Sequence, residues 1–348
     1  MIVRKANKEF LESFPELSIR FFVKEKKEKC ILIGNVDSKT REILSCTIEI
    51  GQFAVDILYD SLFDQVVGFL EVSDEIVSKI QLGEDVDKQW GYFVNFANVL
   101  YNDGAMRPYY YPVFAEVVNA YRRNMHDQQG NLLEEDHFVR IGRELQRVRQ
   151  NASSVLDLLD GIEDSTEMMK AYKEGVFTEP VLLTNIQAEV MQTLNDAQEE
   201  QSILIMVQKP KSVQEMWGYL LTAYASTNVK FKRCENCKRF FATTGRGNPI
   251  FCDRIIEGKG RTCRQVMPKV KFYSKAETDP GFWLYNKAYK TMYSRVSTGS
   301  LSKEMFKIWS KKARAKRDEC TIGQISPEDY SAWLCNNGLH IDYLKENG

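Results

Sequence analysis

Histidine is scarce in this sequence, with three residues among 348. None of the three lies at metal-ligand spacing from another histidine or beside a nucleophile motif such as Gly-x-Ser-x-Gly. The chain also lacks the P-loop that binds nucleotide phosphates and the Gly-x-Gly-x-x-Gly turn of dinucleotide-binding folds. Because these common signs of catalysis are missing, we predict that the protein is not an enzyme.

Long apolar runs are missing as well. No run approaches the roughly 20 residues that a helix needs to cross a bilayer. Residues 1–10 mix charged and apolar side chains, which is not the pattern of a secretory signal. We therefore expect a cytoplasmic protein with no membrane partner, in a reducing compartment where thiolates stay available to bind metal.

Cysteine, in contrast, is concentrated in one short segment. Four of the eight cysteines, Cys234, Cys237, Cys252 and Cys263, are spaced Cys-x2-Cys, then fourteen residues, Cys, ten residues, Cys. A Cys-x-x-Cys turn can present two thiolates to one ion, and tetrahedral zinc with Zn–S distances of about 2.3 Å needs two more ligands. The spacing predicts one structural Zn²⁺ ion bound by all four cysteines.

The residues between the cysteines predict a hairpin. Residues 238–244 and 250–252 have the composition of strands, with a turn at 245–249, so that Cys252 returns towards the first cysteine pair. Two alternatives to a zinc site are a redox Cys-x-x-Cys motif and four unrelated core cysteines. A redox motif normally lies at a helix N-terminus, whereas this cysteine pair precedes a predicted hairpin, so the redox alternative is disfavoured. Residues 253–262 are expected to be exposed. A closed shell of four thiolates leaves no open position for substrate, so the site would stabilise the fold.

Charge is distributed unevenly along the chain. Residues 230–318 contain 23 Lys and Arg against 7 Asp and Glu, whereas residues 1–229 contain 23 against 36. Such a basic block most commonly binds phosphate backbones, because each neutralised phosphate releases condensed counterions. The alternative is that the basic surface packs against the acidic N-terminal part of the same chain.

Hydrophobic periodicity predicts a mainly α fold with a small N-terminal antiparallel β unit, a helical body and a C-terminal four-cysteine zinc hairpin followed by helices. The corresponding domains are residues 1–51, 52–211 and 212–348. Strands are expected at 19–23, 30–36, 43–50 and 203–207. Helices are expected at 53–70, 90–100, 113–121, 138–159, 180–200, 212–225, 280–296 and 302–318, with a short last helix from Ser326.

Aromatic residues are expected mainly in cores. Tyr109, Tyr110 and Tyr111 precede Pro112 at a predicted helix start, and a buried aromatic cluster explains them better than a stacking surface. In the helix 280–296, aromatic side chains recur at helical spacing, which also indicates core packing more often than base stacking.

The cysteine segment resembles two families of zinc proteins. Residues 232–241, 251–254 and 261–263, with the helices that follow, resemble a family of Firmicutes proteins over about residues 212–335. That resemblance implies an accessory or mobile-element protein with a C-terminal zinc domain, and that family has no established activity. The segment is also similar in part to the zinc finger of CGNR-type regulators. In that finger the second two cysteines lie close together before Gly-Asn-Arg, whereas ten residues separate Cys252 from Cys263 here. Many zinc knuckles also have glycine at the position of Lys238.

The leading hypothesis is a zinc-dependent nucleic-acid-binding protein, with DNA and RNA both open. The predicted phosphate contacts are Lys232, Arg233, Lys238, Arg239, Arg246, Arg254, Arg261 and Arg264 around the zinc site, and Lys311, Lys312 and Arg314 on the basic helix. The alternative is a protein-interaction or scaffold protein in which the zinc site is purely structural.

Overall fold

The computed structural model describes residues 9–36, 39–126, 136–177, 185–194, 200–244 and 248–335. Contacts between Cα atoms group the chain into two units, Met1–Ile250 and Phe251–Gly348. The fold is mainly helical, with an antiparallel sheet near the N-terminus and a small hairpin that carries cysteines, which confirms the predicted fold class. The domain boundaries predicted after residues 51 and 211 stay predictions.

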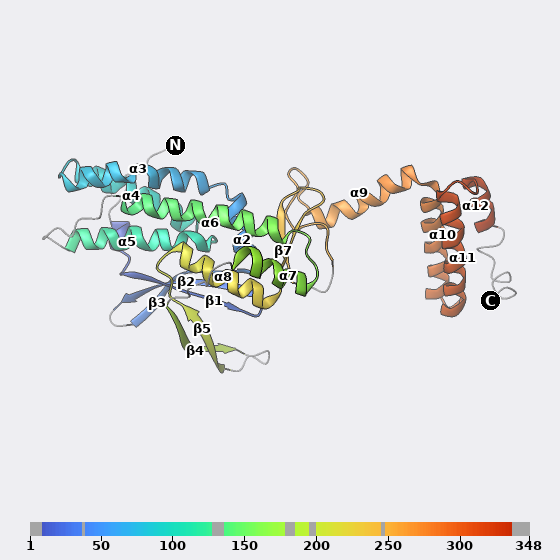
Figure 1. The fold of residues 1–348 in the computed structure, drawn as a ribbon, viewed down its shortest axis with the longest axis horizontal. Coiled ribbons are helices and arrows are strands. Elements are labelled where there is room, and N and C mark those ends of the chain that lie inside the picture. The colour runs from blue at the N-terminus through green and yellow to red at the C-terminus, as the bar shows by residue number, and fades with distance from the viewer. Residues whose placement is uncertain are drawn as a thin grey trace. The chain divides into compact units, whose positions relative to one another are not determined.

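The larger β-sheet in the described part of the first unit has five antiparallel strands in the order β3-β2-β1-β5-β4 (Figure 1). Its strands are β1 (Leu17–Lys24), β2 (Lys27–Val36), β3 (Lys39–Glu49), β4 (Ile186–Leu194) and β5 (Glu200–Gln208). The first three form the predicted β unit. The helix predicted over residues 180–200 is wrong for β4: its Gln, Glu, Met and Leu residues favour helix locally, but pairing with β5 outweighs this preference.

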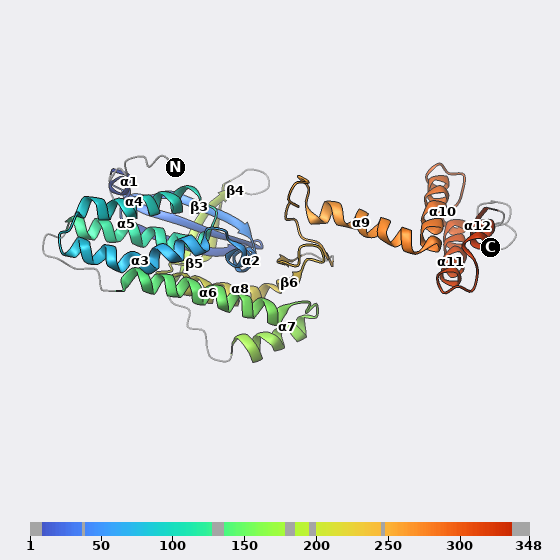
Figure 2. The ribbon, with the colours of Figure 1, turned by 90° about the horizontal axis from the view of Figure 1, so that it is seen from above.

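Helices α3, α4, α5 and α6 lie side by side on one side of this sheet (Figures 1 and 2). The helices of the unit are α1 (Glu9–Glu12), α2 (Gln52–Tyr59), α3 (Phe63–Gln81), α4 (Val86–Asn102), α5 (Tyr111–His126), α6 (His137–Leu159), α7 (Ser165–Ala171) and α8 (Val213–Thr227), with short turns η1 (Pro108–Tyr110) and η2 (Tyr172–Val176). Tyr109, Tyr110 and Tyr111 are buried, as predicted, and the first two donate hydrogen bonds to Asp60.

Gly51 fixes a close approach between α2 and the cysteine hairpin of the same unit. Its φ is +86°, and a Cβ atom placed there would lie 2.6 Å from the Cβ of Ala242. Ala242 belongs to β7 (Phe240–Thr243), which pairs with β6 (Lys230–Arg233). Only glycine combines this backbone conformation with this space, so the start of α2 packs directly against the hairpin that presents the first two cysteines.

The second unit contains α9 (Cys263–Thr278), α10 (Pro280–Ser297), α11 (Lys303–Thr321) and α12 (Pro327–Trp333). The predicted starts are confirmed by their caps: Asp279, Ser302 and Ser326 each accept a backbone N–H three residues later, at 2.9, 3.2 and 3.0 Å. Helices α10 to α12 enclose their own core, in which Met292, Trp309 and Tyr330 are fully buried. Every helix in the described part of the chain is too short or too polar to traverse a bilayer.

Candidate metal centre

The turn between β6 and β7 presents the first two cysteines. The N–H of Cys234 donates to the carbonyl of Arg239 at 3.0 Å, and the N–H of Lys238 donates to the carbonyl of Cys234 at 2.9 Å. These bonds close a tight loop around Cys237. Lys238 has a φ of +61°, in the left-handed region where glycine is usual. The loop therefore brings the thiols of Cys234 and Cys237 close together, although no glycine occupies position 238.

The predicted hairpin is displaced along the chain. β7 pairs with β6, which precedes the cysteine pair, and residues 250–252 form no strand. Ile250 instead accepts a hydrogen bond from the N–H of Glu235 at 2.9 Å. The predicted strand partner of residues 240–243 is wrong because the true partner, β6, is only four residues long and consists mostly of charged residues, so it gives no apolar strand signal. The predicted turn residues 245–247 lie outside the described residues.

Cys252 and Cys263 lie at the two ends of a folded, largely exposed loop. The N–H of Cys263 donates to the carbonyl of Arg254 at 3.0 Å, and the N–H of Arg264 donates to the carbonyl of Cys252 at 2.9 Å. Cys263 is also the first residue of α9, where the positive end of the helix dipole favours negative charge. The loop was predicted to be exposed, and it is.

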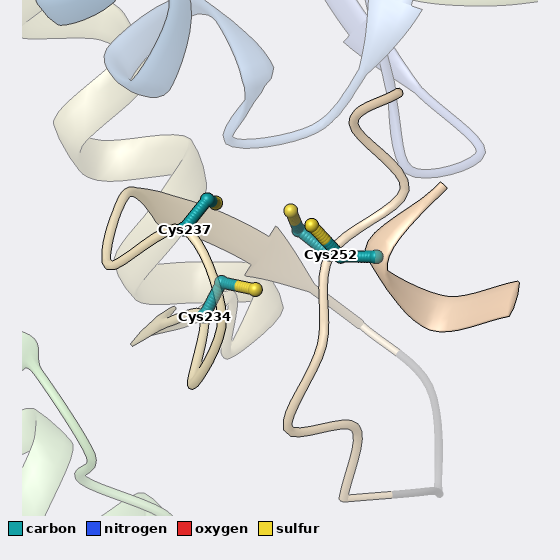
Figure 3. A group of neighbouring side chains, drawn as sticks. Cys234, Cys237 and Cys252 are labelled. Carbon is teal, nitrogen blue, oxygen red and sulfur yellow. The ribbon is translucent and has the colours of Figure 1, made fainter. Parts of the chain in front are cut away.

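The four Sγ atoms all lie within 4.8 Å of one another. Figure 3 shows Cys234 and Cys237 on the turn, with Cys252 on the opposite segment. Tetrahedral zinc with Zn–S bonds of about 2.3 Å places its sulfurs about 3.8 Å apart, so a contraction of about 1 Å at the widest pair suffices. Cys234, Cys252 and Cys263 are buried and Cys237 is half-buried. Four soft sulfur ligands at this spacing can hold one metal ion.

The cysteine hairpin is attached to α2 and α6 by polar contacts. The N–H of Phe240 donates to the Tyr59 hydroxyl at 2.9 Å, and the Arg239 guanidinium lies 5.2 Å from the centre of the Tyr59 ring. Asp160, next to the end of α6, accepts the N–H of Arg233 at 3.1 Å. The hairpin is thus fixed to the helical part of its own unit.

Two of the predicted phosphate contacts have acidic partners within the first unit. The Lys232 ammonium forms an ion pair with Glu163 at 2.7 Å, and the Lys232 side chain is only 11% exposed. That contact holds the pKa of Glu163 below its usual value. Arg233 pairs with Asp157 and, at 3.2 Å, with Asp160. Lys232 and Arg233 thus pack against acidic residues of the N-terminal part of the same chain, which was the alternative to phosphate binding.

The remaining predicted phosphate contacts differ in exposure. Lys238, Arg239, Arg261, Lys311 and Arg314 are exposed, and Arg254 and Lys312 are partly buried. Arg264 is exposed and forms an ion pair with Asp253 at 3.0 Å. Arg246 lies outside the described residues. Binding of nucleic acid by these residues stays a prediction.

Helix α9 was not predicted from the sequence, because the first helix expected after the cysteines begins at Pro280. Pro268 inside α9 and its few apolar residues concealed the periodicity. One signal was present: Thr262 and Gln265 form a capping box in which each side chain bonds the other's backbone N–H. That signal places Cys263 at the first helical position.

Comparison with known proteins gives one match. The model of a family of unknown function, DUF6076, matches residues 182–339. This range contains the four cysteines and helices α8 to α12. The searches of curated proteins and of solved structures gave no match. The matched family has no assigned activity, so the function must be argued from the site itself.

Proposed function

We propose that this protein binds one structural zinc ion and, through its second unit, a nucleic acid. Four thiolates form a closed tetrahedral site with no open position for substrate. Zn²⁺ is the ion that structural sites of this kind usually bind, and it has no redox chemistry. Residues 251–317 contain 17 Lys and Arg against 5 Asp and Glu. A polyanion is the partner that this charge favours.

A basic stripe on α11 carries the nucleic-acid proposal. Lys303, Lys307, Lys311 and Arg314 recur at i, i+4, i+8 and i+11, so they share one face of the helix. All four side chains are exposed, whereas Trp309 on the opposite face is fully buried in the core. Among the described residues, no carboxylate forms an ion pair with these four cations, whereas Lys232 and Arg233 each have acidic partners. Within the described part of the chain, the stripe therefore faces solvent without an acidic partner.

The test is a fluorescence-anisotropy titration of zinc-loaded protein with labelled single-stranded and duplex DNA and RNA. If the stripe neutralises four phosphates, affinity should fall by about 50- to 150-fold between about 50 and 200 mM salt. Lys307→Glu/Lys311→Glu should weaken binding to every sequence and reduce the slope of log K against log salt by about 2.

The matched control is Lys170→Glu/Lys173→Glu, which makes the same charge change at exposed positions of the first unit. It should leave the affinity close to that of the wild type. Equal loss in both double variants would show that only net charge matters and would contradict a site on α11. No binding to any of the four ligands at low salt would reject the nucleic-acid function.

A protein-interaction role is the second candidate, and hairpin β4–β5 favours it. Val190 and Leu204 lie opposite each other in this hairpin and are 67% and 71% exposed, and Met206 is 54% exposed. β4 is also one of the two edge strands of the five-stranded sheet. Exposed apolar faces on edge strands are typical of association surfaces. This candidate predicts partner binding that is insensitive to salt and is abolished by Leu204→Glu, with no affinity for nucleic acid at physiological ionic strength.

A further inference from the structure

Aromatic side chains reach the surface of the basic second unit. Trp283 is 45% exposed and Tyr293 is 56% exposed, both on α10. The core of α10 to α12 is already filled by Tyr285, Met292 and Trp309. The two exposed rings are therefore not needed to fill this core, although the aromatic residues of this helix were expected mainly in the core.

Helix geometry places these rings in one continuous row with two cations. Trp283, Lys287, Lys290 and Tyr293 follow one another at spacings of four, three and three residues, so each is a surface neighbour of the next. All four are exposed. The row, which we call the α10 aromatic–lysine face, spans about 15 Å at the helical rise per residue.

Tyr293 and Lys290 of this face are restrained by packing. The Tyr293 ring stacks on Tyr289 at 6.2 Å and meets the edge of Phe306 at 5.9 Å. The Lys290 ammonium lies 5.9 Å from the ring centre of Phe272 of α9, which itself packs on Phe282 at 5.3 Å. Side chains restrained in this way lose little entropy when a ligand binds.

We propose that the α10 aromatic–lysine face binds single-stranded nucleic acid, with bases stacked on Trp283 and Tyr293 and phosphates on Lys287 and Lys290. This inference rests on the proposed nucleic-acid function and names the form of the ligand. Aromatic platforms alternating with cations are the arrangement that binds single strands, because unpaired bases expose their π faces. A duplex buries those faces, so exposed rings would add little to its binding. The surrounding excess of positive charge favours a polyanion over a neutral apolar partner.

Tryptophan fluorescence tests the stacking directly. Of the five tryptophans, Trp90, Trp217 and Trp309 are buried and Trp333 is half-buried, so Trp283 is the most exposed. We expect oligo(dT) to quench the emission of the full-length protein, and Trp283→Phe to remove the quenching while binding persists. Heparin, a polyanion without bases, should bind without quenching.

Affinity provides the second arm of the test. Trp283→Ala and Tyr293→Ala should each weaken binding of single-stranded oligo(dT) by about 5- to 150-fold and leave duplex binding nearly unchanged. Tyr92→Ala is the matched control, since Tyr92 is a 43% exposed tyrosine of the first unit. It should bind oligo(dT) like the wild type.

The outcomes separate this inference from the proposed function. If both alanine variants bind oligo(dT) with wild-type affinity while Lys307→Glu/Lys311→Glu still weakens binding, the α10 face is rejected and the nucleic-acid function stands. If the alanine variants lose duplex and single-strand affinity equally, the single-strand preference is rejected. If the wild type binds no nucleic acid at low salt, both proposals fail.

Discussion

Lys238 occupies the backbone position that usually requires glycine in a cysteine turn. Its φ of +61° lies in the left-handed region, where a Cβ atom approaches the following carbonyl group. Two backbone hydrogen bonds hold the turn in this conformation: the N–H of Lys238 donates to the carbonyl of Cys234, and the N–H of Cys234 donates to the carbonyl of Arg239. The position of Cys237 thus depends on a residue whose side chain is exposed and binds no metal.

We expect Lys238→Gly to be more stable than Lys238→Ala by about 1 kcal/mol, because only glycine removes the left-handed strain while both variants lose the charge. Denaturant unfolding of the metal-loaded proteins measures this difference. Equal stability of the two variants would mean that the turn relaxes and that φ at this position carries no cost.

Glu28 joins three elements of the first unit. It lies on β2 and is 1% exposed, and its carboxylate accepts hydrogen bonds from the N–H of Gly51 at 2.6 Å, the N–H of Phe53 at 3.1 Å and the Tyr224 hydroxyl at 2.8 Å. It therefore caps the start of α2 and ties it to α8. Burial raises the pKa of Glu28 from 4.5 to about 8, although the three hydrogen bonds lower it.

Stability should consequently fall as pH rises from about 4.5 to about 8. In this range the folded protein keeps a proton on Glu28 that the unfolded chain releases, so the free energy of unfolding decreases by at most about 1.4 kcal/mol per pH unit. Urea unfolding at a series of pH values measures the slope. Glu28→Gln, which cannot titrate, should flatten it relative to the wild type.

Tyr224→Phe gives an independent check in case Glu28→Gln does not fold. Removing the hydroxyl takes away a hydrogen bond that lowers the pKa of Glu28. The pH range over which stability falls should then extend upwards. A wild-type protein whose stability is constant across this range would show that Glu28 is ionised throughout.

At the scale of the whole molecule, the proposed metal site and the core of the C-terminal helices lie in different segments. The core of α10 to α12 contains none of the four clustered cysteines, whereas the cysteine turn and the loop 252–263 contribute few buried apolar side chains of their own. Zinc binding stabilises small zinc-finger peptides by roughly 10–16 kcal/mol in apparent terms. The loop and turn are therefore the segments whose stability the proposed zinc ion would supply.

We expect a zinc chelator to increase hydrogen exchange at the amides of Cys234 and Arg264, while amides in the middle of α10 and α11 keep their protection. Hydrogen exchange with mass spectrometry on the full chain measures both sets. Cys252→Ser should reproduce the effect of the chelator, and Cys335→Ser, which changes an exposed cysteine outside the cluster, should not. Simultaneous loss of protection in α10 and α11 would contradict this separation.

Local signals in the sequence were sufficient for most of the elements. Asp279, Ser302 and Ser326 mark helix starts because capping involves only residues three positions apart. The spacing of the four cysteines predicted their clustering because two short loops limit how far they can separate. Strand β1 and its neighbours were predicted from short apolar and β-branched runs separated by charged and turn residues, which are local signals as well.

Features that depend on distant residues were decided only by the tertiary structure. The pairing of β4 and β5, against the helical preference of β4, arises from contacts that no window of the sequence contains. The pairing of Lys232 and Arg233 with Glu163, Asp157 and Asp160 joins residues about seventy positions apart.

The sequence by itself determined the four clustered cysteines, the helix caps and the excess of positive charge, because these follow from residue identity and short spacing. The tertiary structure decided which cations are neutralised by acidic partners and which aromatic rings remain exposed. Both outcomes depend on which surfaces pack together, and packing is set by the sum of many weak long-range contacts. The α10 aromatic–lysine face became visible only once the core beneath it was known.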